Sequence, residues 1–210
     1  MSAPLETTLG DLTGDWIMRT LTNADAPQNK TLSDDPDPVL ALQGVSWFKR
    51  TIIAHATVTL HVRQYVTAEE GSDGDSALTH IDIDQTVTGG IKGTTELRTL
   101  DWAARGHSDD TFGDVKGRSR WLADLEAPGA GADGELDDFL KDGWLHEAAG
   151  PQGEAFVQSW VINEGAGWTA QQIWGFATVD GERYHTRRVV VKKGDEVVKV
   201  RLIYDWQGKK

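Results

Sequence analysis

Alternation of apolar and polar residues runs through most of the chain and predicts an antiparallel β protein. The alternating runs are rich in β-branched and aromatic residues, which pack well on a pleated sheet. Asp180-Gly181 lies directly between two such runs, and this dipeptide is the strongest short hairpin signal. The expected strands are Gly14–Thr22, Thr57–Val66, Thr79–Thr88, Thr94–Trp102, Thr111–Leu122, Ala155–Asn163, Trp168–Val179, Glu182–Val191 and Val197–Trp206, with Trp144–Glu147 as a short tenth.

A segment between the first two runs follows a helical spacing instead. Asp37 suits a helix N-cap, and Pro38 suits the first helical position. Gly44 lowers helix propensity inside the segment, so one helix and two short helices joined near Gly44 are both open. We expect a helical lid over about residues 36–54. Its apolar stripe consists of Val39, Leu42, Val45, Phe48 and Ile52.

The order of these elements predicts one all-β domain over residues 1–210. Nine or ten antiparallel strands with short turns favour a closed barrel, because closure removes the exposed edges of a large open sheet. The stretch Ala123–Gly143 is rich in Gly, Ala, Asp and Glu and is expected to be a surface loop. The inward positions of a small barrel either fill the lumen or line one ligand cavity.

Alternation also assigns the strand faces, on the assumption that the barrel exterior is solvated. In Trp168–Val179 we place the face with three aromatic rings inside, because those rings in water would form a costly patch. In Glu182–Val191 we expect Tyr184 to point inward, and the reversed register, which buries His185 and Arg187, stays open. The predicted lumen side chains are Gln85, Ser119, Trp121, Gln172, Trp174, Phe176, Tyr184 and Tyr204.

Composition narrows the chemistry. The 210 residues include no Cys, which excludes thiol catalysis, disulfides and Cys-ligated metal sites. With Lys+Arg 21 against Asp+Glu 33, the formal net charge is −12, which argues against nucleic acid or an anionic membrane as partner. Nine Trp accompany only three Tyr and five Phe. Packing in the core and contact with a ligand are both open as explanations for this excess of Trp. The segment Met1–Gly10 lacks the pattern of a signal peptide, so we expect a cytoplasmic protein.

Motifs for metal, nucleotide or nucleophilic chemistry are weak or missing in the sequence. There is no Gly-x-Ser-x-Gly elbow, His-Glu-x-x-His pair or dinucleotide fingerprint, and we expect no cofactor. His80-x-Asp82-x-Asp84 places an imidazole and two carboxylates on one strand face. We favour a solvated face over a metal site there, because Ile81 and Ile83 take the interior.

Two motifs resemble the calycin superfamily. Gly14-Asp15-Trp16 opens the first strand as the Gly-x-Trp motif does in lipocalins, and the insertion Val39–Arg50 resembles the helical lid of intracellular fatty-acid-binding proteins. The resemblance implies that Trp16 seals the barrel base and that Arg201 packs over it. The whole chain is similar to lipocalin-like proteins of filamentous fungi, some of which are cofactor-free cyclases, including Diels–Alder-type pericyclases.

The two leading hypotheses place a hydrophobic small molecule in the lumen. A cyclase would hold a polyketide or terpenoid in a reactive geometry, with Tyr184, Tyr204 and Gln85 binding a carbonyl. A carrier would hold a carboxylate with an inward cation such as Arg187 or Arg201. A third hypothesis is an interaction protein with an inert barrel and an acidic exterior. The expected ligand contacts are Trp47, Phe48, Ser119, Trp121, Gln172, Trp174 and Phe176.

Overall fold

The computed structural model describes residues 1–18, 32–68 and 77–209. This part of the chain is built almost entirely from antiparallel strands, with short helices in two connections. None of the described helices has the length and apolar character needed to cross a membrane. The elements are β1 (Gly14–Met18), α1 (Asp37–Leu42), α2 (Trp47–His55), β2 (Val58–Ala68), β3 (Ala77–Val87), β4 (Ile91–Thr99), β5 (Arg105–Asp109), β6 (Gly113–Leu122), the 3₁₀ helix η1 (Asp138–Leu140), β7 (Phe156–Asn163), β8 (Trp168–Val179), β9 (Glu182–Lys193) and β10 (Glu196–Gly208).

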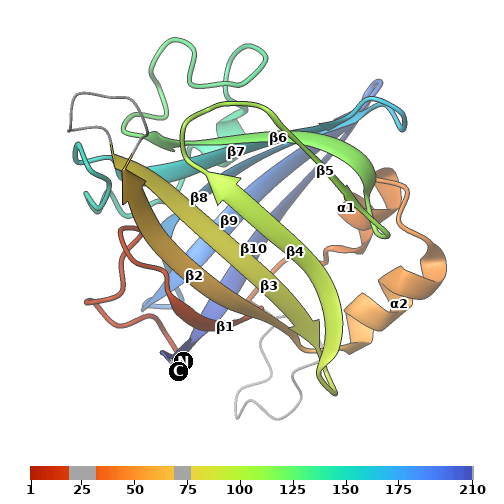
Figure 1. Ribbon diagram of the computed structural model, residues 1–210, viewed down its shortest axis with the longest axis horizontal. Coiled ribbons are helices and arrows are strands. Elements are labelled where there is room, and N and C mark those ends of the chain that lie inside the picture. The colour runs from red at the N-terminus through yellow and green to blue at the C-terminus, as the bar shows by residue number, and fades with distance from the viewer. Residues whose placement is uncertain (19–31, 69–76, 210) are drawn as a thin grey trace.

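The strands form a single sheet that curls into a nearly closed barrel (Figure 1). Its order is β4-β3-β2-β1-β10-β9-β8-β7-β6-β5, so β4 and β5 are the two edges. The chain after β4 crosses to β6, where Asp101 bridges Arg120 and the Trp102 N–H donates to the Ser119 carbonyl at 2.8 Å. The all-β barrel expected from the alternation is therefore confirmed, with a split between β4 and β5.

Three of the strand predictions are wrong in part. The expected strand Thr94–Trp102 is β4, Ile91–Thr99, which lies three residues earlier at each end. The segment around Trp144–Glu147 forms only an isolated bridge, from Leu145 to Phe176, and the tenth strand is β5 instead. The expected strand from Thr111 begins at Gly113, because residues 110–112 form the turn between β5 and β6. The predicted strand positions 19–22 lie outside the described residues.

The β8–β9 hairpin fixes which side chains point inward. Val179 pairs with Glu182 across the two-residue turn, where Asp180 and Gly181 have φ of 51° and 83°, as a type I′ turn requires. The register sets Trp174 opposite Arg187 and Phe176 opposite His185. Directly opposed residues share a face of the sheet. Because the aromatic face of β8 points inward, Arg187 and His185 of β9 point inward as well.

The outer face of β7–β9 is covered rather than solvated. Residues 123–150 fold over it with their own apolar core, and Trp144 lies in that core with its indole N–H donating to the Leu140 carbonyl. A Cβ at Gly175 would come within 2.9 Å of the Trp144 ring, so glycine is what permits this contact. The expected surface loop is thus a packed cover, and the assumption of a solvated exterior is wrong on these strands.

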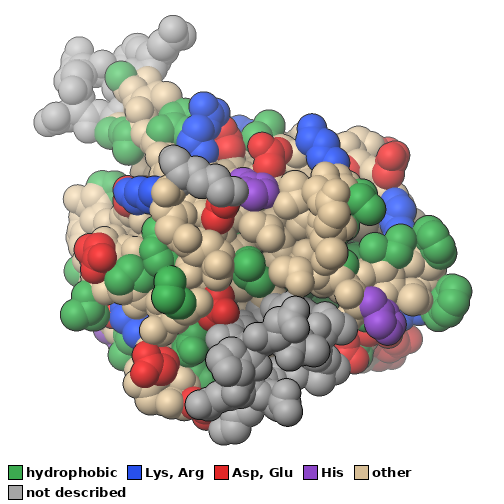
Figure 2. All heavy atoms as spheres, turned by 90° about the horizontal axis from the view of Figure 1, so that it is seen from below, with side chains coloured by type: hydrophobic (Ala, Val, Ile, Leu, Met, Phe, Trp, Pro, Cys, Tyr) green, Lys and Arg blue, Asp and Glu red, His purple; other side chains and the backbone are tan. Residues whose placement is uncertain are grey.

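The helical insertion consists of two helices, so of the two alternatives left open by the sequence, the one with a break near Gly44 is correct. The φ of Gly44 is 83°. On α1, Val39 is buried against Trp168, Val191 and Val200, so this helix covers one end of the barrel. By contrast, α2 has no buried residue. Figure 2 shows hydrophobic side chains gathered at the end of the molecule where α2 lies.

Trp16 lies deep in the core near the other end of the barrel. It is fully buried, its indole N–H donates to the Leu12 carbonyl at 2.9 Å, and its ring lies 4.7 Å from that of Trp206. The implied packing of Arg201 over this ring is wrong, because Arg201 pairs with Arg188 on the outer face of β10. Instead, Arg183 fastens the N-terminal segment across this end through the carbonyls of Ala3, Pro4 and Thr7.

Candidate functional site

A polar band crosses the lumen between two apolar ends. The apolar ends are the cluster around Trp16 and the cluster under α1. Strand pairing places the members of the band on the inner faces of seven different strands. Several keep partial exposure although they point inward. The members are Gln85, Glu96, Arg98, Ser119, Trp121, Ser159, Gln172, Trp174, Arg187 and Tyr204.

Glu96 and Arg98 form the centre of this band. Arg98 binds Glu96 Oε2 through Nε at 2.9 Å and Nη2 at 2.7 Å, and Gln85 Nε2 donates to Oε1 at 2.9 Å. The other Arg98 nitrogen, Nη1, donates to Ser159 Oγ at 2.5 Å. Burial alone would raise the pKa of Glu96, but the charges of Arg98 and Arg187 and these hydrogen bonds outweigh it and lower the pKa. Glu96 is therefore an ionised carboxylate.

Arg187 lies beside this pair and is only partly satisfied. Its side chain is 4% exposed, and its guanidinium carbon lies 3.8 Å above the Trp174 ring and 5.2 Å from the Tyr204 ring centre. Nη1 is 3.8 Å from Glu96 Oε2, which is too long for a hydrogen bond. Nε and Nη2 have no hydrogen-bond partner among the described residues. The lumen thus holds a buried cation with two unused donors.

His185 and Tyr204 are buried next to Arg187 and carry no charge near neutral pH. Burial and then the Arg187 charge lower the pKa of His185 well below its ordinary value, although a hydrogen bond to the Gly175 carbonyl opposes them. Burial raises the pKa of Tyr204, with the Arg187 charge opposing it. The His185 Nδ1–H donates to Gly175, so Nε2 is the unprotonated nitrogen and has no partner among the described residues.

The structure gathers most of the residues that the alternation placed inside. Tyr184 is an exception, because it lies on the outer face of β9 against Val179 and Ile203, and the reversed register is the correct one. Trp47 and Phe48 are 71% and 68% exposed on α2, so they are not brought into the lumen. The predicted residues that do share the inner face are Gln85, Ser119, Trp121, Gln172, Trp174, Phe176 and Tyr204.

The sequence analysis missed Glu96 and Arg98 because charged residues usually lie on the outside of a strand. Here Leu97 between them is 67% exposed, the reverse of what hydrophobicity alone indicates. Their inward position follows from the pairing of Ile83 with Glu96 and of Ile81 with Arg98. The register of β3 with β4 shifts between Asp84 and Thr86, so this pairing cannot be derived from the sequence by counting residues from the turn.

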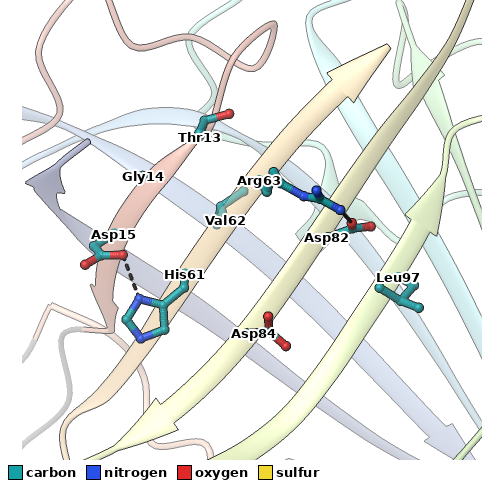
Figure 3. A pocket seen from close by; sticks show the side chains of 9 residues that line it. All are labelled: Thr13, Gly14, Asp15, His61, Val62, Arg63, Asp82, Asp84 and Leu97. Atoms are coloured by element: carbon teal, nitrogen blue, oxygen red, sulfur yellow. Dashed lines mark hydrogen bonds and ion pairs between the residues drawn. The ribbon is translucent and has the colours of Figure 1, made fainter. Parts of the chain in front are cut away.

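A hollow of about 450 Å³ also lies on the outer face of β1–β4 (Figure 3). Its charged side chains are engaged with each other: Asp15 contacts His61 at 2.6 Å, and Arg63 contacts Asp82 at 2.7 Å. No group of three metal-binding side chains is found among the residues that the structure describes. The residues that line the hollow include no aromatic ring other than that of His61, whereas the lumen has indole and phenol walls.

No protein-family model matches the chain. Among characterised sequences, the chain is 28% identical over 207 residues to the probable pericyclase scpY of Mollisia scopiformis, and the match covers 99% of this chain and 95% of that protein. It is also 28% identical over 180 residues to pericyclase pydY of an Acremonium species, with 86% and 88% covered. The stated resemblance to fungal pericyclases is confirmed by these two proteins.

Two solved structures are similar to the chain at lower sequence identity. A Schistosoma mansoni fatty acid binding protein in complex with arachidonic acid has a TM-score of 0.47 and 16% identity, covering 93% of this chain and 96% of that one. The wild-type fluorescent protein UnaG has a TM-score of 0.47 and 13% identity, covering 93% and 97%. The barrel architecture given above rests on the strand pairings of this chain itself.

Proposed function

We propose that this barrel is a cofactor-independent pericyclase. It encloses an apolar, conjugated natural-product chain of the polyketide or terpenoid type and closes a ring within it. The observation that carries the proposal is the lumen, where unused Arg187 donors lie against an aromatic wall. Its support from outside the structure is the similarity to proteins named pericyclases, one of them over nearly the full length of both chains.

Ring closure of this kind is an isomerisation. Two π bonds of the bound chain become σ bonds of the new ring, no atom enters or leaves, and no proton has to move. The protein contributes by holding the reacting ends in contact, which converts an unfavourable entropy into a bound geometry. We assign this shaping to the flat rings of Trp121, Trp174 and Phe176, which line the lumen.

The polar band supplies the second contribution. A hydrogen bond to a carbonyl conjugated with the reacting double bond withdraws electron density and lowers the barrier. We assign this role to Arg187 and to the hydroxyl of Tyr204, whose ring lies beside the Arg187 guanidinium. Gln85 donates to Glu96 and therefore acts as a positioning residue that fixes the Glu96–Arg98 pair. Tyr184 has no part in the site, because it lies on the outer face.

The test uses the precursor that accumulates when the gene for this chain is deleted from its own host. We expect the purified protein, without added cofactor, to convert this precursor into a cyclic isomer of identical mass. Trp174→Leu should slow the conversion at least tenfold, because it removes a wall of the lumen, a loss of about 1.4 kcal/mol or more. Trp160→Leu, a matched change on the outer face beside Arg118, should leave the rate unchanged. A precursor that binds and is recovered unaltered would establish a carrier instead.

A further inference from the structure

Among the residues that the structure describes, the charges that face the middle of the lumen do not balance. Arg98 and Arg187 are cations and Glu96 is an anion, while His185 and Tyr204 are neutral in their buried sites. Glu96 is already held by Arg98 in a two-bond contact, so one positive charge is left over on Arg187.

Other charged groups on the inner faces of the described strands lie toward the ends of the barrel. Arg105 and His107 are 48% and 43% exposed, where water screens their charge. Arg183 is engaged at the closed end with the N-terminal segment. None of these groups offsets the charge of Arg187. The pairs are Arg105 with Asp101, His107 with Asp109, and Arg183 with Glu147.

The two unused nitrogens of Arg187 form one side of its guanidinium. Nε–H and Nη2–H point in parallel, and their spacing fits the two oxygens of a single oxyanion. The remaining nitrogen, Nη1, points toward Glu96. Arg187 shares its one nearby carboxylate with Arg98, and a buried cation that is only partly compensated is strongly unfavourable. This arrangement is that of a site whose counter-ion arrives with the ligand.

The side chains around Nε and Nη2 of Arg187 indicate the chemical character of the rest of the ligand. Arg187 lies on the Trp174 ring, and Leu202 is its direct neighbour on β10. The apolar cluster around Trp16 lies on one side and the cluster under α1 on the other. A molecule bound at Nε and Nη2 of Arg187 would therefore lay an apolar chain along these rings and need only one charged group.

We propose that Arg187 binds an oxyanion and that the natural ligand is a long apolar molecule with one acidic head, a carboxylate or the enolate of a 1,3-dicarbonyl. That this ligand is also the molecule that undergoes ring closure rests on the proposed function. The Glu96–Arg98 pair then holds the second cation in place, and the incoming head group completes the charge balance of the lumen.

The test compares parinaric acid, a fluorescent polyene carboxylic acid, with its methyl ester and its primary alcohol, titrated against the intact chain. We expect the acid to bind at least tenfold more tightly than either neutral analogue and to raise the thermal midpoint more. Arg187→Met should bind all three alike, and Arg187→Lys should keep part of the preference because it keeps the charge but not the fork. Arg63→Gln removes a cation that is 71% exposed on the outer face and should keep the full preference.

Equal binding of acid and neutral analogues by the intact chain would overturn the inference. So would an acid preference that survives in a folded Arg187→Met variant, with folding checked by circular dichroism. If Arg187→Met does not fold, the partial preference of Arg187→Lys and the acid-specific rise of the thermal midpoint decide the matter. Ring closure of a precursor without any acid preference would overturn this inference alone, and acid preference without ring closure would overturn the proposed function alone.

Discussion

His185 and Arg187 stand two positions apart on the same inner face of β9, and the barrel treats their charges differently. His185 is surrounded by the rings of Trp16, Phe176 and Tyr204, which disfavour its protonated form. The charged guanidinium of Arg187 lies against the Trp174 face. A neutral imidazole below a charged guanidinium thus separates the apolar floor of the lumen from its polar band.

The neutral state of His185 has a consequence for stability. In the unfolded chain this imidazole takes up a proton below about pH 6.5, whereas in the folded protein it stays neutral, so the unfolded state binds more protons as the pH falls. We expect its contribution to the free energy of unfolding to decrease by up to about 2 kcal/mol between about pH 7 and about pH 5. His185→Phe, which keeps a ring in this site, should lack that decrease in urea denaturation. The same decrease in both proteins would contradict the buried neutral imidazole.

At the residue scale, alternation predicted the inner side where the large apolar residues of a strand gather on one face. It placed Trp174 and Tyr204 correctly, and both are now buried in the core. It failed for Tyr184, because both faces of β9 are covered and either one satisfies a hydrophobicity argument. It also could not find Glu96, since a buried carboxylate depends on cations from distant strands.

The two helices of the insertion differ in burial: α1 packs against the barrel, whereas α2 has no buried residue. α1 inserts Val39 into the apolar cluster at the barrel end, while α2 is joined to it by the Arg50–Asp37 ion pair at 2.7 Å. α2 also reaches the β5–β6 turn, where Lys49 donates to the Asp110 carbonyl. The insertion is therefore fixed to the barrel through α1 and held at its rim through polar contacts of α2.

This division predicts unequal effects of truncation. Val39→Ala removes two buried methyl groups and should lower the free energy of unfolding by about 1–2 kcal/mol. Phe48→Ala removes a larger side chain that is 68% exposed and should change it by less than about 0.5 kcal/mol. Urea denaturation of both variants measures the difference. A larger loss for Phe48→Ala would show that α2, and not α1, covers the barrel.

At the element scale, the sequence predicted strands with an apolar face and missed the strand without one. β5 consists of Arg-Gly-His-Ser-Asp, with no apolar residue to alternate, and it is an edge strand held by β6 alone. The covering segment 123–150 was expected to be a loop because its apolar residues are too widely spaced for a helix or strand pattern. Tertiary packing, which no local pattern contains, decides both cases.

At the scale of the whole molecule, the chain has a net negative charge, whereas the polar band of the lumen holds two arginines and one carboxylate. The formal net charge is −12, and Figure 2 shows acidic and basic side chains interspersed on one face. Five of the nine tryptophans show how the rings are distributed: Trp121 and Trp174 line the lumen, Trp16 and Trp206 pack near its floor, and Trp144 lies outside under the cover. The excess of indole rings serves both a binding cavity and the outer packing of the barrel.

The central claim is that the lumen, and not the outer hollow beside His61, is where the apolar molecule binds. A crystal structure of the chain with parinaric acid tests it most directly. We predict density for the polyene inside the barrel along Trp174, with its carboxylate on Nε and Nη2 of Arg187. Density confined to the hollow between His61 and Arg63, or a lumen filled by side chains in the presence of bound ligand, would contradict the account.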